Sequence, residues 1–204
     1  MNAEIEVKFC DVDINDIRAR LEKAGGICQQ RMRLMRRVLI EEPHHTKERA
    51  FLRIRDEGDK VTLTYKRRTK PDNQTTIDST HELETTVGDF DTTVKIFSEA
   101  GWDYITYQES RRETWQLGKC EVVIDEWPWL APMIEIEGQT EIAVRQTAEL
   151  LHFSWQEAVY GSVDVVYHTV FPSMTCRGII DVKEARFGDP IPQQFGTPIA
   201  SNRV

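Results

Sequence analysis

The sequence has few cysteines and no long apolar run, and these two absences narrow the class of protein first. Its four cysteines, Cys10, Cys28, Cys120 and Cys176, are far apart and form no C-x-x-C pair, so we expect reduced thiols. No apolar run approaches the roughly 20 residues of a membrane-spanning helix, and the first residues show no basic region followed by an apolar stretch. We therefore expect a cytoplasmic protein without a membrane partner.

The chain also lacks an excess of basic residues. Its 204 residues include 26 lysines and arginines against 34 aspartates and glutamates, which gives a net charge of -8 at pH 7. This balance argues against nucleic acid as a partner, because a nucleic-acid binder needs a large basic surface. The length fits one domain. We place that domain at residues 1–171 and interpret residues 172–204, which are rich in Gly and Pro, as an irregular C-terminal tail.

Two kinds of hydrophobic periodicity alternate along the domain. Helical spacing predicts four amphipathic helices, at about residues 14–24, 90–100, 140–152 and 154–168, the last opening with Ser154 and Glu157 in a capping-box pattern. Strand alternation marks eight segments, which is enough to close a barrel: residues 4–9, 33–41, 50–55, 61–68, 81–87, 106–117, 121–125 and 133–137. Residues 42–48 and 69–79 are polar, contain Pro43 and Pro71, and are predicted to be loops.

The alternation sorts the charged residues onto one face of the sheet, because residues two apart in a strand share a face. The opposite face is apolar and needs the helices as cover. The charged face is either the wet side of an open antiparallel sheet or the lining of a closed one. In a closed sheet, the carboxylates suit Mg²⁺ or Mn²⁺ and the basic groups suit phosphate oxygens. A metal-bound triphosphate would satisfy both sets.

The order of these charged motifs resembles a known family. The first strand carries Glu4-Ile5-Glu6-Val7-Lys8, an E-x-E-x-K motif. It is followed in order by Arg53-Ile54-Arg55, Leu63-Thr64-Tyr65-Lys66, Glu82-Leu83-Glu84, Arg111-Arg112, Asp125 and Glu135-Ile136-Glu137. Over residues 3–170 the chain resembles the CYTH family of triphosphate tunnel metalloenzymes, named for class IV adenylate cyclases and thiamine triphosphatases. The resemblance implies an α+β fold, an eight-stranded closed antiparallel β-tunnel with a charged interior and about four helices outside.

The resemblance also implies roles for individual residues, with Mg²⁺ or Mn²⁺ as cofactor. Candidate catalytic residues are Glu4, Glu6, Lys8 and Lys66. Candidate phosphate-binding residues are Lys8, Arg53, Arg55, Lys66, Arg68, Arg111 and Arg112, of which Arg112 fits the family motif better than Arg111. Candidate metal ligands are Glu4, Glu6, Glu82, Glu84, Asp125, Glu135 and Glu137.

The function implied is that of a divalent-metal-dependent phosphohydrolase acting on a triphosphate moiety, which could be inorganic triphosphate, thiamine triphosphate or a nucleoside triphosphate. One alternative is a class IV adenylate cyclase, which converts ATP to cyclic AMP and pyrophosphate. Another is a non-catalytic polyphosphate- or nucleotide-binding module. The expected partner is the small-molecule substrate, and the sequence leaves a homodimer open. Trp127-Pro128-Trp129 is interpreted as a packed strand connection, with contact to an organic group of the substrate as the alternative.

Overall fold

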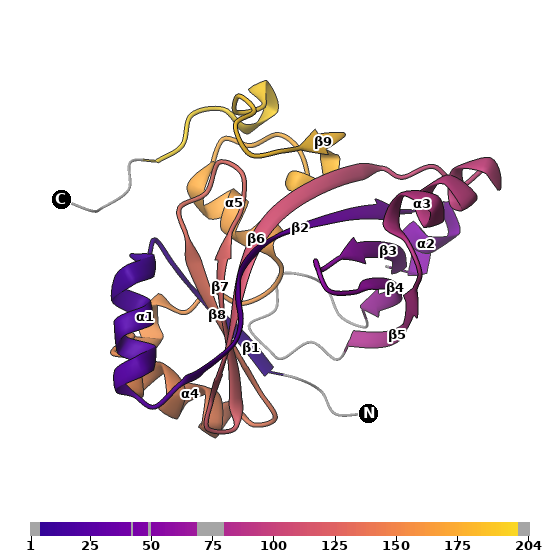
Figure 1. The fold of residues 1–204 in the computed structure, drawn as a ribbon. Coiled ribbons are helices and arrows are strands. Elements are labelled where there is room, and N and C mark those ends of the chain that lie inside the picture. Colours follow the sequence, from indigo (N-terminus) through magenta and orange to yellow (C-terminus); the bar gives the residue numbers. More distant parts are fainter. Residues whose placement is uncertain (1–4, 42, 49, 69–79, 200–204) are drawn as a thin grey trace.

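The computed structural model describes residues 5–41, 43–48, 50–68 and 80–199 (Figure 1). The strands are β1 (Ile5–Cys10), β2 (Ile27–Ile40), β3 (Ala50–Asp56), β4 (Val61–Arg68), β5 (Thr80–Val87), β6 (Thr106–Leu117), β7 (Cys120–Glu126), β8 (Met133–Gly138) and the short β9 (Glu184–Ala185). The α-helices are α1 (Ile14–Lys23), α2 (Pro43–Glu48), α3 (Phe90–Glu99), α4 (Glu141–Leu150) and α5 (Val163–Val170). Three short 3₁₀ helices complete the fold: η1 (Trp155–Glu157), η2 (Ile179–Asp181) and η3 (Gln193–Phe195).

Three of the predicted helices begin at a side chain that caps their first turn. Asp13 accepts a hydrogen bond from the amide of Asp16, Asp89 accepts one from Thr92, and Thr140 accepts one from Ala143. These bonds satisfy amides that have no partner inside the helix. The predictions of α1, α3 and α4 are confirmed.

The predicted helix at residues 154–168 is wrong, and so is the predicted capping box. The chain forms η1, breaks, and starts again as α5, and Ser154 makes no side-chain capping bond. The break arises because Val159 is extended and pairs with β1, exchanging two backbone hydrogen bonds of 2.9 and 2.8 Å with Lys8. The predicted loop at residues 42–48 is also wrong, since residues 43–48 form α2.

The sheet has the strand order β1-β8-β7-β6-β2-β3-β4-β5, with every pair in this path antiparallel. β9 adds a short parallel pairing to β6. Within the described ranges no ladder joins β1 to β5, so the wall of the tunnel has a seam there, next to the bridge between Lys8 and Val159. The α+β fold built on an eight-stranded antiparallel sheet is confirmed.

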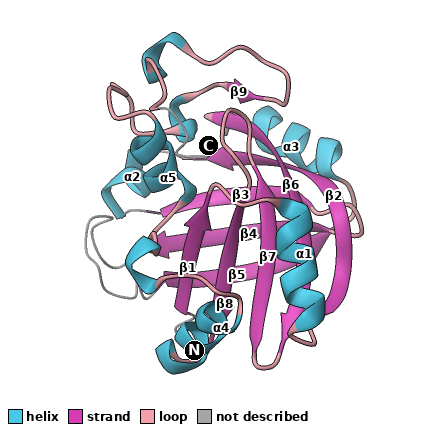
Figure 2. Cartoon of the chain, turned by 90° about the vertical axis from the view of Figure 1, so that its left-hand side faces the viewer, coloured by secondary structure: helices cyan, strands magenta, loops and turns pink. Residues whose placement is uncertain are grey.

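The sheet divides into two walls. We call β1, β8 and β7 the first wall and β3, β4 and β5 the second wall. The long strands β2 and β6 belong to both, and they curve so that the strands of one wall run across those of the other (Figures 1 and 2). The ladder between β2 and β6 contains register shifts between Cys28 and Arg33, which is where such curvature can be introduced.

Each wall buries its apolar face under helices. Outside the first wall, α1 and α4 pack Ile17, Leu21 and Val144 against the strand residues Val7 and Ile136, all of which are fully buried. Outside the second wall, Phe90 of α3 packs against Val38 and Ile54. The charged faces of both walls are therefore left to face each other.

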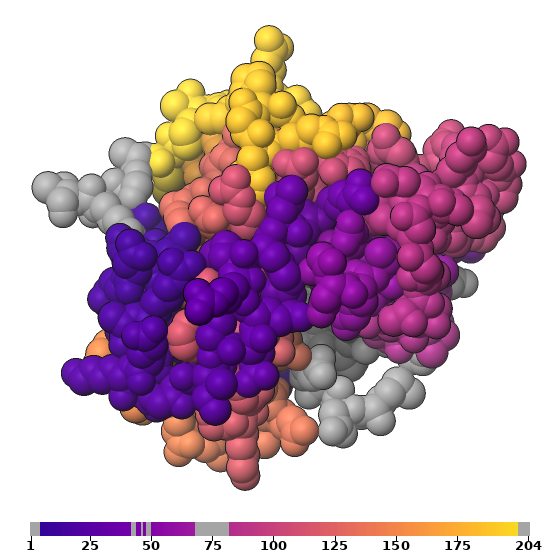
Figure 3. All heavy atoms as spheres, viewed as in Figure 1, coloured from indigo at the N-terminus to yellow at the C-terminus, as the bar shows by residue number. Residues whose placement is uncertain are grey.

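A third cluster of apolar residues lies where α5 and the tail meet the sheet. We call it the end cluster; it contains Trp127, Met133, Val163, Val166, Tyr167, Phe171, Ile179, Val182, Ala185 and Phe195. The tail residues 172–199 contribute four of these ten side chains. Figure 3 shows the tail, in yellow, as a layer over the upper part of the molecule. In the part of the chain that is described, no helix is long and apolar enough to cross a membrane.

Candidate active site

The inner face of the first wall brings together the charged residues of β1 and β8. In the antiparallel register Glu6 lies opposite Glu137, and Lys8 lies opposite Glu135. The Nζ atom of Lys8 lies 2.9 Å from Glu6 and 3.1 Å from Glu135. Strand alternation turns all four side chains to the same side, as predicted.

Three of these carboxylates can reach a common ion. Oxygen atoms of Glu6, Glu135 and Glu137 all lie within 4.8 Å of one another. We call these three residues the acidic group. Carboxylate oxygens are the ligands that Mg²⁺ and Mn²⁺ prefer, so the residues present fit the predicted metal.

The charges of the acidic group are not balanced by Lys8 alone. Burial opposes ionisation of Glu135, but the cations of Lys8 and Arg112 outweigh it and hold the pKa of Glu135 at about 2. The pKa of Glu6 is raised, by burial first and then by the negative charge of Glu135. Two carboxylates therefore compete for one ammonium group, and a divalent cation at this place would relieve their repulsion.

Asp125 of β7 is held by Arg112 of β6 rather than by the acidic group. The two residues face each other across the ladder, and the guanidinium donates two hydrogen bonds of 2.7 and 2.6 Å to the carboxylate. Burial lowers the pKa of Arg112, but the charge of Asp125 outweighs it and raises the pKa above its ordinary value. This bidentate pair fixes the Arg112 side chain inside the tunnel.

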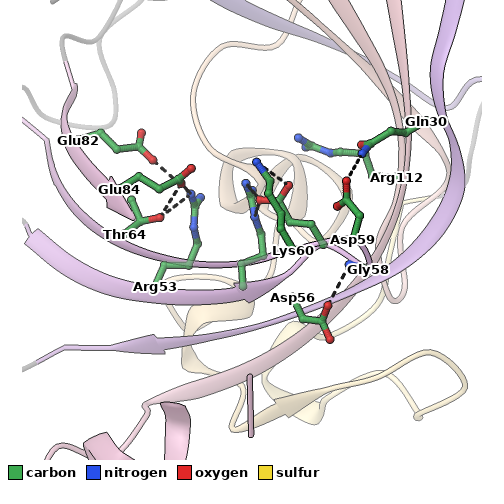
Figure 4. A network of polar contacts seen from close by, with 12 residues as sticks. Gln30, Arg53, Asp56, Gly58, Asp59, Lys60, Thr64, Glu82, Glu84 and Arg112 are labelled. Carbon is green, nitrogen blue, oxygen red and sulfur yellow. Dashed lines mark hydrogen bonds and ion pairs between the residues drawn. The ribbon is translucent and has the colours of Figure 1, made fainter. Parts of the chain in front are cut away.

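The inner face of the second wall carries a network of basic and acidic side chains (Figure 4). Arg53 lies 3.3 Å from Glu82 and 3.6 Å from Glu84, and Lys66 lies 3.3 Å from Glu82. Figure 4 shows Arg53 and these carboxylates converging on the space into which Arg112 projects from the other side. Glu82 and Glu84, predicted as metal ligands, are thus brought to the cations of the second wall, whereas the acidic group lies on the first.

Arg37 of β2 was missed by the sequence analysis. It lies opposite Arg55 of β3, its Nε donates a 2.8 Å hydrogen bond to Gln108, and its guanidinium lies 4.5 Å from the ring centre of Trp127. Burial, and then the charge of Arg53, lowers the pKa of Arg37 to about 9. Strand alternation over residues 33–41 puts Arg37 on the same face as Arg33 and Met35. Because the neighbouring Arg36 puts an arginine on the opposite face as well, the alternation alone does not single out Arg37.

Arg53 and Arg55 complete a group of three arginines with Arg37, which we call the arginine group. Burial, and then the charge of Arg55, lowers the pKa of Arg53 to about 10. The buried Nε of Arg53 has no hydrogen-bond partner in the described structure. Arg55 is held by Glu57 through a 2.8 Å bond from its Nε. Crowded guanidiniums with a donor to spare are suited to a polyanion.

One predicted phosphate-binding residue, Arg111, is not brought into this arrangement. Arg111 lies on the opposite face of β6, 3.6 Å from Glu126 and with its guanidinium 4.3 Å from the ring centre of Phe187. We therefore leave Arg111 out of the site. Glu4 and the side chain of Arg68 lie outside the described residues.

The comparison with family models identifies the family. The CYTH domain model matches residues 2–166. The chain therefore belongs to the CYTH family, and the resemblance drawn from the charged motifs is confirmed.

Solved structures share the fold. A conserved hypothetical protein from Pyrococcus furiosus is 20% identical, with a TM-score of 0.62, and the match covers 76% of this chain and 94% of that one. A candidate adenylate cyclase from Vibrio parahaemolyticus is 12% identical, with a TM-score of 0.65 and coverage of 81% and 98%. Another candidate adenylate cyclase, from Bacillus halodurans, is 17% identical, with a TM-score of 0.52 and coverage of 75% and 91%. A comparison with curated proteins found no match.

Proposed function

We propose that this protein is a divalent-metal-dependent phosphohydrolase that acts on a triphosphate moiety. The observation that supports this most is that a group of carboxylates and a group of arginines line different parts of the same inner surface. The acidic group lies on the first wall, the arginine group lies along β2 and β3, and both face inward. A metal-bound triphosphate is a ligand that can satisfy both groups at once.

The chain's own residues account for binding and orientation. Arg37, Arg53 and Arg55, with Lys66 and Arg112, would hold the phosphate oxygens and stabilise the charge that builds on the leaving oxygen. Lys8, fixed by Glu6 and Glu135, would present its ammonium group to the phosphate nearest the acidic group.

The acidic group would hold Mg²⁺ or Mn²⁺. The ion, when bound, supplies neutralisation of phosphate charge and a water of lowered pKa. Glu4 precedes Glu6 by two residues in the same motif and belongs to the proposed ligand set on that ground. The four cysteines are all free thiols, which supports the proposal of a cytoplasmic protein.

The experiment that tests this function separates it from both alternatives. Purified protein is incubated with inorganic triphosphate, thiamine triphosphate or ATP, each with Mg²⁺ or Mn²⁺, and the products are resolved by phosphorus NMR and chromatography. We expect orthophosphate from at least one substrate. Cyclic AMP and pyrophosphate from ATP would make the protein a class IV adenylate cyclase instead. Tight metal-dependent binding without any product would make it a polyphosphate- or nucleotide-binding module.

A substitution ties the activity to the site. Glu6→Gln should abolish metal-dependent turnover without changing the circular dichroism spectrum, because the amide keeps the shape and removes the charge. Turnover equal to that of the wild type would remove the acidic group from the proposed site.

A further inference from the structure

The tail reaches the arginine group through the first half of β6. Residues 172–199 lie beyond residues 2–166, the part of the chain that the CYTH model matches. The ladder between β6 and β7 begins at Arg111, and ahead of it β9 of the tail pairs with β6 at Tyr107 and Gln108 (Figure 1). A segment of the tail is therefore part of the sheet, beside a strand that belongs to both walls.

A chain of three hydrogen bonds runs from this segment to Arg37. The hydroxyl of Thr106 donates a 2.6 Å bond to the backbone carbonyl of Val182 in the tail. The Nε2 atom of Gln108 donates a 3.2 Å bond to the Thr106 hydroxyl, and its Oε1 atom accepts a 2.8 Å bond from Nε of Arg37. Thr106 and Gln108 are 0% and 1% exposed, so bulk water does not compete for these bonds.

The direction of each bond in this chain follows from its two ends. A backbone carbonyl can only accept a hydrogen bond, and the Nε of an arginine can only donate one. Thr106 must therefore donate to Val182 and accept from Gln108, which turns the amide oxygen of Gln108 toward Arg37. A glutamine is suited to the middle position because its amide offers a donor and an acceptor at once.

The chain and Trp127 together fix the guanidinium of Arg37. Gln108 lies directly opposite Arg37 in the register of β2 and β6 and holds its Nε, while the ring centre of Trp127 lies 4.5 Å from the guanidinium carbon. An arginine that is ordered before binding loses less side-chain entropy when it binds a phosphate. The fixed orientation of Arg37 would therefore strengthen the binding of a polyanion.

We infer that Gln108 is a positioning residue for triphosphate binding, and that the tail holds Gln108 in place through Thr106. This inference rests on the proposed function. Gln108 acts through Arg37 and does not itself bind phosphate. The tail thus contributes to the affinity of the site in addition to its packing in the end cluster.

The affinity for a triphosphate that resists hydrolysis tests the role of Gln108. The probe is diimidotriphosphate, in which NH groups replace the bridging oxygens, with Mg²⁺, and titration calorimetry gives its dissociation constant. Gln108→Met removes the acceptor for Arg37 at nearly constant volume, and we expect about tenfold weaker binding. Wild-type affinity in this variant would overturn the inference.

Two substitutions of Thr106 test the link to the tail. Thr106→Val removes the hydroxyl at nearly constant shape and should weaken binding of the probe, because Gln108 loses its second contact. Thr106→Ser keeps the hydroxyl and should bind as the wild type does. Equal losses in the two variants would overturn the part of the inference that concerns the tail.

A double variant separates positioning of Arg37 from a general weakening of the fold. If Gln108 acts through Arg37, the double variant Gln108→Met and Arg37→Gln should bind the probe as weakly as Arg37→Gln alone. An independent loss on top of that of Arg37→Gln would overturn the inference. Thr106→Val provides the same comparison if Gln108→Met does not fold.

Gln116 on the same strand provides the control. Its Nε2 donates hydrogen bonds of 3.1 and 2.9 Å to the carbonyls of Gly118 and Cys120, at the turn into β7. Gln116→Met loses bonds of the same kind and should keep the wild-type affinity, whereas a loss equal to that of Gln108→Met would overturn the inference. Absence of binding by the wild-type protein would overturn the proposed function itself.

Discussion

Arg37 of β2 and Arg55 of β3 lie directly opposite each other in an antiparallel ladder, with like charges facing inward. Like charges in facing positions destabilise a sheet, and the lowered pKa of Arg37, about 9, reflects burial and the charge of the nearby Arg53. The free protein therefore holds an unfavourable concentration of positive charge. A bound polyanion would relieve this repulsion between the arginines, and the relief would contribute to the binding free energy.

Replacing Arg37 should lower the affinity for triphosphate without lowering the stability of the ligand-free protein. Arg37→Gln should weaken binding of inorganic triphosphate by roughly tenfold to a hundredfold, since a charge-assisted contact is lost. The same change removes a repulsive charge, so the free energy of unfolding of the ligand-free protein should stay equal or rise. Titration calorimetry measures the first quantity and urea denaturation the second.

The adjacent Arg36 provides the control because its side chain points outward. It pairs with Asp56 at 3.0 Å and with Asp91 at 3.2 Å. Arg36→Gln should lower stability slightly and leave triphosphate affinity unchanged. The inward assignment of Arg37 is contradicted if the two variants lose affinity equally.

The position of the acidic group predicts that two glutamates of neighbouring strands differ in their effect on Mn²⁺ affinity. Glu137→Gln should weaken Mn²⁺ binding by about tenfold or more, because loss of a ligand exceeds the effect of an outer contact. Glu126→Gln, on the outer face beside Arg111, should leave Mn²⁺ binding unchanged. Electron paramagnetic resonance of free Mn²⁺ gives both affinities, and a wild-type value for Glu137→Gln would exclude this residue as a ligand.

Glu113 predicts how stability depends on pH. This buried carboxylate accepts hydrogen bonds from Arg18 at 3.0 and 2.8 Å, from the indole of Trp115 at 2.8 Å and from the amide of Met32 at 3.2 Å. Burial opposes its ionisation, but the bond from Arg18 and the others outweigh it and lower the pKa of Glu113 below its ordinary value of 4.5. Ionised Glu113 therefore stabilises the folded protein at any pH above the pKa that this carboxyl has in the unfolded chain. This stabilisation is lost as the pH falls through the lower pKa of Glu113 in the folded protein.

Glu113→Gln should therefore cost about 1–3 kcal/mol of unfolding free energy near neutral pH and reduce the acid dependence of stability. Urea denaturation from about pH 7 to about pH 3 measures both effects. Glu141→Gln, which breaks an exposed pair with Arg145, is the control and should change little. An unchanged acid dependence in Glu113→Gln would show that other groups control it.

Two glycines of the tail differ both in backbone conformation and in what an added Cβ would meet. Gly178 and Gly188 both have positive φ angles, +137° and +89°. A Cβ on Gly178 would come within 2.3 Å of the Asp164 carboxylate, whereas one on Gly188 would meet nothing within 4 Å. Gly188→Ala should cost about 1–2 kcal/mol, and Gly178→Ala should cost more, as measured by urea denaturation. Equal costs would mean that Asp164 moves aside freely.

The sequence predicted the walls of the tunnel well because strand alternation is local. Glu6, Lys8 and Glu135 are placed inward by parity alone, and the order of the charged motifs along the chain then indicates the family. Helices α1, α3 and α4 could be predicted equally well, because the capping side chain and the apolar stripe of each helix lie within one short stretch of sequence.

The features that the sequence did not predict depend on contacts between segments that are distant in the chain. The break between η1 and α5 follows from the pairing of Val159 with Lys8, which no local pattern contains. Arg111 and Arg112 are adjacent, and only the register with Asp125 and Glu126 shows which of them faces inward. Trp127 was correctly interpreted as packed, but its contact with Arg37 requires the fold.

The division of the sheet into two walls has a consequence for motion. The walls are joined only through β2 and β6 in the described ranges. The acidic group lies on the first wall, whereas Arg53 and Arg55 of the arginine group lie on the second. A ligand bound by both groups would connect the two walls across the seam between β1 and β5. Amide exchange along these two edge strands should therefore slow when metal and triphosphate bind together, and much less when either binds alone.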